Sequence, residues 1–214
     1  MNVTIPGGEY LTGSLDVISQ SLTIPVLVIL LIIVVISIIA LGGLISEYTS
    51  RKKVPVGVIR DLIYDINSAE SVEALKGIID GAKIPKSQKK VLTEIASSSA
   101  LDVNSREALA RKLVEFEEEK IDKTLRQTDI ITRVGPTLGL MGTLIPMGPG
   151  LAALGAGDIN TLASSLTVAF NTTIVGIGSG ALCYVIGKIR SGWYDRYLSD
   201  LDALTDSVLD KMNN

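Results

Sequence analysis

Polar side chains within long apolar stretches are the first candidates for chemistry in this sequence. Thr143 lies in "GLMGT", and Asn171, Thr172 and Thr173 lie together in "AFNTTIVG". Threonine hydroxyls in membrane helices commonly donate to a carbonyl of the preceding turn, which is a purely structural role. The alternative is that these four side chains line a path for water or ions. Asn171 in particular requires a partner helix or water, because a carboxamide in hydrocarbon is costly.

Histidine, the side chain most often used in acid–base catalysis, is missing. The chain has no histidine, which excludes His-based metal sites, catalytic dyads and imidazole proton relays. It contains no nucleotide-binding loop, nucleophile motif or metal-ligand spacing, so we predict no enzyme, no cofactor and no metal ion. The net charge of −3 points to no nucleic-acid partner. The one cysteine, Cys183, is interpreted as a small packing residue. If protons move, the titrating carboxylate must come from another chain.

Three charge-free runs are long enough to cross a membrane. They cover residues 17–46, 134–157 and 159–187, in a chain whose mean hydropathy is +0.40. About 20 apolar residues in a helix span the hydrocarbon core, so we predict an all-α protein with three transmembrane helices. The first lysine or arginine is Arg51. The first run therefore lacks the basic start of a cleaved signal peptide and is expected to remain.

The distribution of basic residues predicts the orientation. Only Glu9 and Asp16 are charged before the first run, and the turn at Asp158 has no basic residue. The opposite ends of the runs carry Arg51, Lys52, Lys53, Arg126, Arg133, Lys188, Arg190 and Arg196. The positive-inside rule then places the N-terminus outside and the C-terminus in the cytoplasm, in the cell (inner) membrane. The predicted segments are an external N-terminal segment (1–21), spans at 22–46, 129–156 and 162–188, a cytoplasmic helical domain (47–128), an external turn (157–161) and a cytoplasmic C-terminal helix (189–214).

The cytoplasmic segments have helical spacing and helix boundaries. Serine caps and Gly81 bound one helix, and Pro85 begins the next. The longest helix is expected to begin with Asn104 or Ser105 as its cap and to continue below the membrane from the second span. Its apolar stripe is predicted as Leu109, Leu113, Phe116 and Ile121. The C-terminal helix presents Tyr197, Leu201, Leu204 and Val208 on one face, for packing on the long helix or a neighbouring subunit, after the interfacial aromatics Trp193 and Tyr194.

The acidic segment "EFEEE" has two interpretations. It is either a cation or partner site or, as we favour, a solvated helix face. In the second case its glutamates pair at helical spacing with Lys112, Lys120 and Lys123.

Glycines and prolines are concentrated in the second and third runs. Gly135 and Gly139 are four apart, as are Gly176 and Gly180, and Gly142 lies close by. Small residues at this spacing let helix backbones approach closely. Pro136, Pro146 and Pro149 each remove a backbone donor, which a membrane helix tolerates when protein neighbours compensate. We therefore predict that these two spans pack tightly inside the protein and that the aliphatic first span faces lipid.

These residues resemble those of the MotA/TolQ/ExbB proton channel family. "GPTLGLMGT" is similar to the family's "APLLGLLGT", and "AFNTTIVGIGSGALCYVIG" is similar to its third-span pattern, over roughly residues 126 to 190. The resemblance implies a pentameric ring whose second and third spans line a pore, with Thr143 and Thr173 as the pore threonines. It also implies single-span partner subunits of the ExbD/TolR/MotB type that supply a membrane aspartate, so that the ion gradient moves the partner.

Two positions depart from the family pattern. Val168 stands where Exb and Tol members carry a glutamate. The pore wall of this chain therefore has no acid of its own, which is also the case in the Mot branch. Pro146 stands where the family often has glycine, which leaves sodium open as an alternative to protons. The main hypothesis is an ion-driven motor or stator subunit. The alternatives are a passive oligomeric scaffold that lacks ion coupling and an independent channel.

Overall fold

The structure, a computed structural model, describes residues 8–51 and 54–213. Regular structure in these residues is entirely helical, which confirms the all-α prediction. Residues 1–7 of the predicted external segment, Lys52 and Lys53 of the orientation argument, and Asn214 lie outside the described residues. The helices are α1 (Gly8–Ser21), α2 (Thr23–Ser50), α3 (Val56–Ser68), α4 (Val72–Gly81), α5 (Lys86–Ala96), α6 (Val103–Gly155) and α7 (Ile159–Asn213).

Three helical stretches are long and apolar enough to cross a membrane, as predicted: Tyr10–Ser50, α6 and α7. The 53 residues of α6 and the 55 of α7 make helices of about 80 Å at 1.5 Å per residue. A bilayer core of about 30 Å covers less than half of that length. The turn between them is short, because α7 already begins at Ile159, inside the segment predicted as turn, and Gly157 adopts a φ of 83°.

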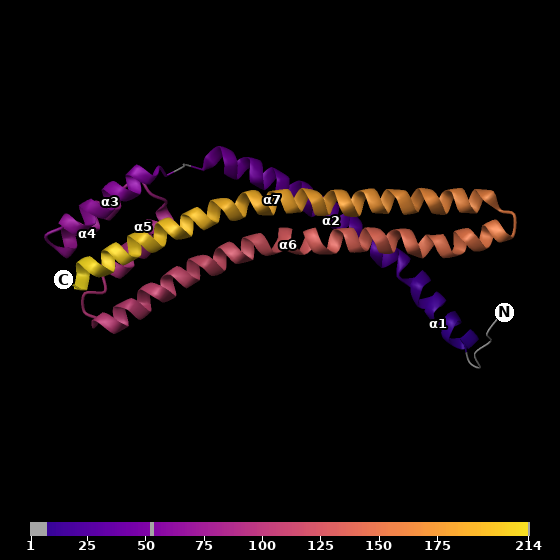
Figure 1. The fold of residues 1–214 in the computed structure, drawn as a ribbon, viewed down its shortest axis with the longest axis horizontal. Coiled ribbons are helices and arrows are strands. Elements are labelled where there is room, and N and C mark those ends of the chain that lie inside the picture. The colour runs from indigo at the N-terminus through magenta and orange to yellow at the C-terminus, as the bar shows by residue number, and fades with distance from the viewer. Residues whose placement is uncertain (1–7, 52–53, 214) are drawn as a thin grey trace. The chain divides into compact units, whose positions relative to one another are not determined.

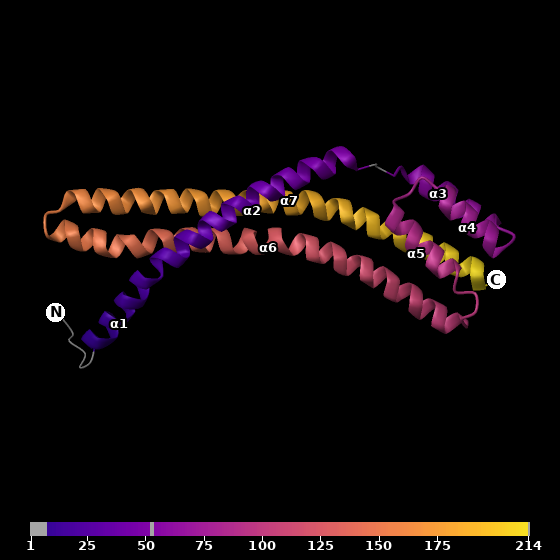
Figure 2. The same cartoon turned by 180° about the vertical axis from the view of Figure 1, so that it is seen from behind.

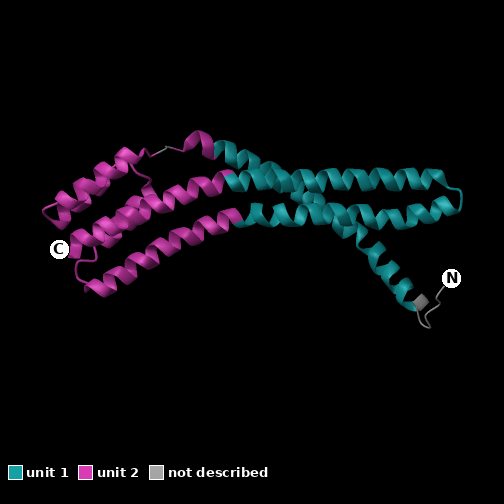
Figure 3. Ribbon diagram, viewed as in Figure 1, with its two compact units in different colours: residues 1–46, 126–188 teal, residues 47–125, 189–214 magenta. Residues whose placement is uncertain are grey.

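The chain divides into two compact units, shown in Figure 3. Unit 1 comprises residues 1–46 and 126–188, and unit 2 comprises residues 47–125 and 189–214. Both α6 and α7 contribute to each unit, since their residue ranges include the boundaries at 126 and 188.

In unit 1, α2 crosses the antiparallel α6–α7 hairpin, as both views show (Figures 1 and 2). One line of α2 residues faces the hairpin, namely Val26, Leu30, Ile33 and Ser37. Ile145 packs against the first two, and Ile131 and Cys183 pack against Ile33. The Cys183 side chain is fully buried, and its Sγ lies 3.3 Å from Ser37 Oγ. Cys183 is thus a packing residue, as the sequence predicted.

Unit 2 has a conventional aliphatic core. Helices α3 to α5 contribute Ile66, Leu75, Ile79, Leu92 and Ile95, which are at most 2% exposed. The predicted C-terminal face meets this core, because Leu201, Leu204 and Val208 are 0% exposed and belong to the same cluster. The α4 boundary is also confirmed, with the Ser71 hydroxyl accepting from the Ala74 amide at 3.1 Å.

Two predictions about α6 were wrong. The helix begins at Val103, so Asn104 and Ser105 lie inside it. Asp102 precedes it, and hydrogen bonding by the Ser105 side chain lowers the pKa of the Asp102 carboxyl. Phe116 is 52% exposed and does not belong to the predicted stripe, whereas Leu113 packs against the unit 2 core as predicted.

Glu117 is the buried member of the acidic segment. It is 9% exposed and accepts hydrogen bonds from the Tyr197 hydroxyl at 3.1 Å and from Lys120 at 2.5 Å. The segment is therefore only in part a solvated face. The other predicted lysines do pair with exposed glutamates, Lys112 with Glu115 and Lys123 with Glu119.

Leu204→Ala tests the unit 2 core. Removing this fully buried side chain is expected to cost about 2–5 kcal/mol, measured as a lower urea midpoint from the fluorescence of Trp193. The control is Leu101→Ala, at a residue that is 40% exposed, with an expected cost within about 0.5 kcal/mol. Equal midpoints for the two variants would contradict the assigned core.

Candidate functional site

The backbones of α6 and α7 meet at glycines in unit 1. A Cβ placed on Gly135 would lie 2.8 Å from the Gly176 carbonyl oxygen. A Cβ on Gly176 would lie 2.5 Å from the Gly135 oxygen and 2.7 Å from Gly139 Cα. Real Cβ contacts are essentially never this short, so no residue larger than glycine fits at Gly176 without displacing a helix.

The same contact continues along both helices through small side chains. A Cβ on Gly142 would lie 2.6 Å from Thr172 Cβ, and one on Gly180 would lie 2.8 Å from Pro136 Cδ. Thr172 is 5% exposed, and its hydroxyl donates to the carbonyls of its own helix at Val168 and Ala169. The structure therefore places Thr172 in the helix contact, where it packs against Gly142.

Thr143 and Thr173 lie at the same level of the hairpin and point to the same side. Thr143 adjoins Gly142, and Gly139 meets the Thr173 backbone at 3.5 Å. Thr143 comes two residues before Ile145, and Thr173 two before Val175; both hydrophobic residues pack against α2. Two residues correspond to about 200° around a helix, so both threonines point away from α2. They flank the α6–α7 contact on the face that α2 leaves uncovered, and each is partly exposed.

Both hydroxyls make the internal hydrogen bond typical of membrane helices. Thr143 Oγ1 donates to the Leu140 carbonyl at 2.6 Å, and Thr173 Oγ1 donates to the Ala169 carbonyl at 3.0 Å. This bond uses the single hydroxyl proton, and the oxygen lone pairs stay free to accept. At this level the two oxygens can accept from water or coordinate a cation.

Asn171 does not join this pair. It precedes Thr173 by two residues and therefore points about 200° away, and its side chain is exposed. Of the four polar residues in the apolar runs, Thr143 and Thr173 thus flank the α6–α7 contact and Thr172 packs within it. Asn171 lies on the opposite face of α7.

The prolines lie within α6, and none of them ends it. Pro146 has no amide hydrogen, so the Gly142 carbonyl, four residues earlier, receives no helical hydrogen bond from it. Pro149 likewise gives no helical hydrogen bond to the Ile145 carbonyl. One helical donor is thus missing at the level of Thr143 and another one turn further along the helix.

A charged cluster in unit 2 was not predicted. Glu47 and Arg190 form an ion pair at 3.0 Å, with side chains only 26% and 12% exposed, and the Tyr194 hydroxyl donates to Glu47 at 2.9 Å. Burial, together with Glu47, raises the pKa of Tyr194 to about 12. Arg51 donates to the Trp193 carbonyl and lies 5.0 Å from its ring centroid. The sequence signal was available, because Glu47 is the first charge after one apolar run and Arg190 closely follows another.

Gly176→Ala tests the close helix contact. We expect overpacking to destabilise the protein by about 1–3 kcal/mol, seen as a lower thermal midpoint in detergent. Gly178→Ala is the matched control, because a Cβ there meets nothing within 4 Å and alanine is the better helix former. A similar loss in both variants would show that glycine at position 176 is not required by the contact.

Comparison with known proteins now identifies the family. Residues 84–203, more than half of the chain, match the MotA/TolQ/ExbB proton channel family. No curated protein sequence matches the chain. The matched region contains α5, α6 and residues 159–203 of α7, and so includes the glycine contact, Thr143 and Thr173. This multi-pass membrane protein therefore belongs to the MotA/TolQ/ExbB proton channel family.

Proposed function

We propose that this chain is the ring-forming subunit of an ion-driven motor, in which ion flow along the α6–α7 face moves a single-span partner. The observation that carries the proposal is the placement of Thr143 and Thr173. They come from two helices, lie at one level, and flank the helix contact on the face away from α2. In a ring with α2 on the outside, this face lines the centre.

The charge-free spans support the need for a partner. Residues 134–157 and 159–187 contain no Asp, Glu, Lys, Arg or His, and Val168 stands where some relatives carry a glutamate. A proton needs a titrating group to cross this region. We infer that a membrane aspartate on an ExbD/TolR/MotB-like partner supplies it, and that this chain forms a homopentamer around the partner in the inner membrane, with its N-terminus outside.

The threonines in this scheme provide acceptors beside the partner carboxylate. Their hydroxyl protons are held by Leu140 and Ala169, so the oxygens face the pore as acceptors. Such oxygens orient water next to a carboxylate and also suit sodium, which prefers hard oxygen ligands. The proline-freed carbonyl of Gly142 adds an acceptor at this level. The motor is thus compatible with either ion, and protons are the family's ion.

Thr143→Val and Thr173→Val test the ion path, since valine keeps the shape and removes the oxygen. Each is expected to lower ion flux by about tenfold, equivalent to about 1.4 kcal/mol for one lost interaction. Flux is measured in vesicles that contain the chain and its partner. Thr137→Val is the control, because its exposed hydroxyl donates to its own helix and it lies outside the contact.

Several outcomes would oppose this proposal. Unchanged flux in both threonine variants would remove their assigned role and favour a passive scaffold. A purified complex without five-fold symmetry would refute the ring. A neighbouring gene for a short protein with one span and a membrane aspartate is expected, and its absence would favour the scaffold or an independent channel.

Pro146→Ala tests the freed carbonyl. Alanine restores the amide donor to Gly142 and removes a helix-interior proline, a difference of up to about 3 kcal/mol. We expect a higher thermal midpoint together with a lower ion flux. Pro149→Ala, which restores the bond to Ile145 one turn away, should raise the midpoint without the same loss of flux. Equal flux in all three proteins would show that Pro146 has only a structural effect.

A further inference from the structure

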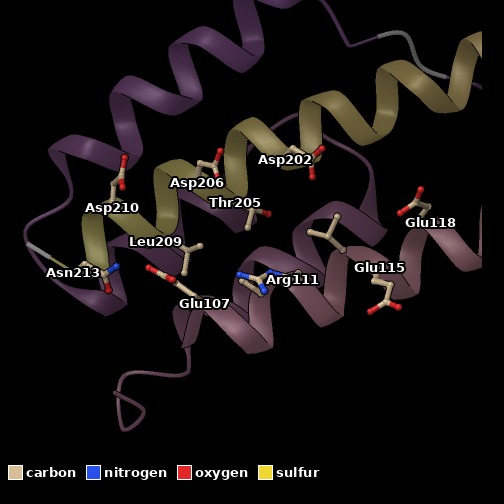
Figure 4. A pocket seen from close by; sticks show the side chains of 12 residues that line it. Glu107, Arg111, Glu115, Glu118, Asp202, Thr205, Asp206, Leu209, Asp210 and Asn213 are labelled. Carbon is tan, nitrogen blue, oxygen red and sulfur yellow. The ribbon is translucent and has the colours of Figure 1, made fainter. Parts of the chain in front are cut away.

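A groove lies between α6 and α7 in unit 2, far along the chain from the ion-path threonines (Figure 4). Its volume is about 720 Å³, and its walls are residues 107–118 of α6 and 202–213 of α7. Val114 and Leu209, both only partly buried, supply apolar surface to the groove. The groove thus offers a hydrocarbon floor bordered by polar side chains.

The groove is strongly acidic. Six carboxylates and one guanidinium line it: Glu107, Glu115, Glu118, Asp202, Asp206 and Asp210, with Arg111. Six negative charges against one positive charge leave a net charge of minus five. Of the six, only Glu115 has an ion-pair partner among the described residues, which is Lys112 at 2.8 Å. Burial and the neighbouring Asp206 carboxylate raise the pKa of Asp202.

A buried hydroxyl in the groove has no partner. Thr205 is 5% exposed and extends from α7 into the groove (Figure 4). Its Oγ1 has no hydrogen bond within the described part of the chain. Thr132, Thr143 and Thr173 all donate to their own helix, so Thr205 is unusual among threonines of α6 and α7. Because a buried unpaired hydroxyl is costly, this feature points to a group that is supplied from outside.

The arrangement of the carboxylates limits the kind of ligand. Among the described residues, no three acidic side chains are close enough to hold one metal ion. The carboxylates instead repeat along about three turns of both helices. Cationic side chains spaced along a peptide fit this pattern. Lysine stems can lie on the apolar floor while their ammonium groups reach the acidic walls.

We propose that this groove binds a lysine- and arginine-rich peptide segment of a partner protein, with the Thr205 hydroxyl donating to a backbone carbonyl of that segment. The docking site is separate from the ion path, so it holds or fails independently of the motor proposal. Its charge also predicts fast, salt-dependent association.

Peptide binding by the full-length protein in detergent tests this inference. The probe is a fluorescent twelve-residue peptide of alternating lysine and serine, followed by anisotropy, and the same peptide with glutamate in place of lysine should not bind. The variant E107Q/D206N/D210N should bind the lysine peptide about tenfold or more weakly. The matched control D61N/E70Q/D65N removes an equal number of negative charges, from exposed sites on or beside α3. It should bind the lysine peptide within about twofold of the parent protein.

Further variants separate a built site from general charge attraction. Thr205→Val should weaken binding, and Thr205→Ser should restore it, with urea midpoints showing that both proteins are folded. Equal binding by the groove variant and its control would overturn the proposal. Tighter peptide binding by the α5 variant K86Q/K89Q/K90Q would also overturn it. That result would show that these three lysines of a second copy of this chain fill the groove.

Discussion

The close contact between the α6 and α7 backbones is the constraint on which the membrane unit depends. Lipid tails are as apolar as leucine, so burying hydrocarbon does not drive helices together in a bilayer. Close van der Waals packing has to hold the two helices together instead, and it requires small residues on both of them. Gly135 and Gly176 bring the backbones to distances at which no Cβ fits, and a Cβ on Gly139 would lie only 3.2 Å from Gly176 Cα. This contact sets the rotation of both helices about their axes.

The rotation decides which side chains reach the free face. Once Gly142 and Gly176 face the partner helix, Thr143 and Thr173 must flank the contact, and Thr172 must lie within it. The packing of Ile145 and Val175 against α2 then assigns the other side of the hairpin to the first span. A family member whose residues 134–157 and 159–187 contain no Asp, Glu, Lys, Arg or His thereby presents two threonine hydroxyls on the side of the hairpin that α2 leaves uncovered.

Unit 2 follows the rules of proteins in water. Its core is aliphatic, and the hydrophobic effect favours burial of Leu201, Leu204 and Val208 against α3 to α5. Some of its polar side chains form hydrogen bonds between helices. Glu117 accepts a hydrogen bond from the Tyr197 hydroxyl inside the unit, while the six carboxylates of the α6–α7 groove outnumber its one guanidinium. Helices α6 and α7 therefore make two kinds of contact: a close glycine contact in unit 1 and an aliphatic core in unit 2.

The sequence by itself determined the elements and much of the site. Charge-free runs defined three apolar helices, glycine spacing identified the helices that pack closely, and the motif around Thr143 and Thr173 indicated the family. Periodicity relates residues on one helix to each other, but it does not say which direction faces a neighbour. Only the tertiary structure decided that Thr172 lies within the α6–α7 contact, and that Glu117 is buried while Phe116 is exposed. Each of these depends on contacts with another helix, distant in sequence, whose position no local pattern contains.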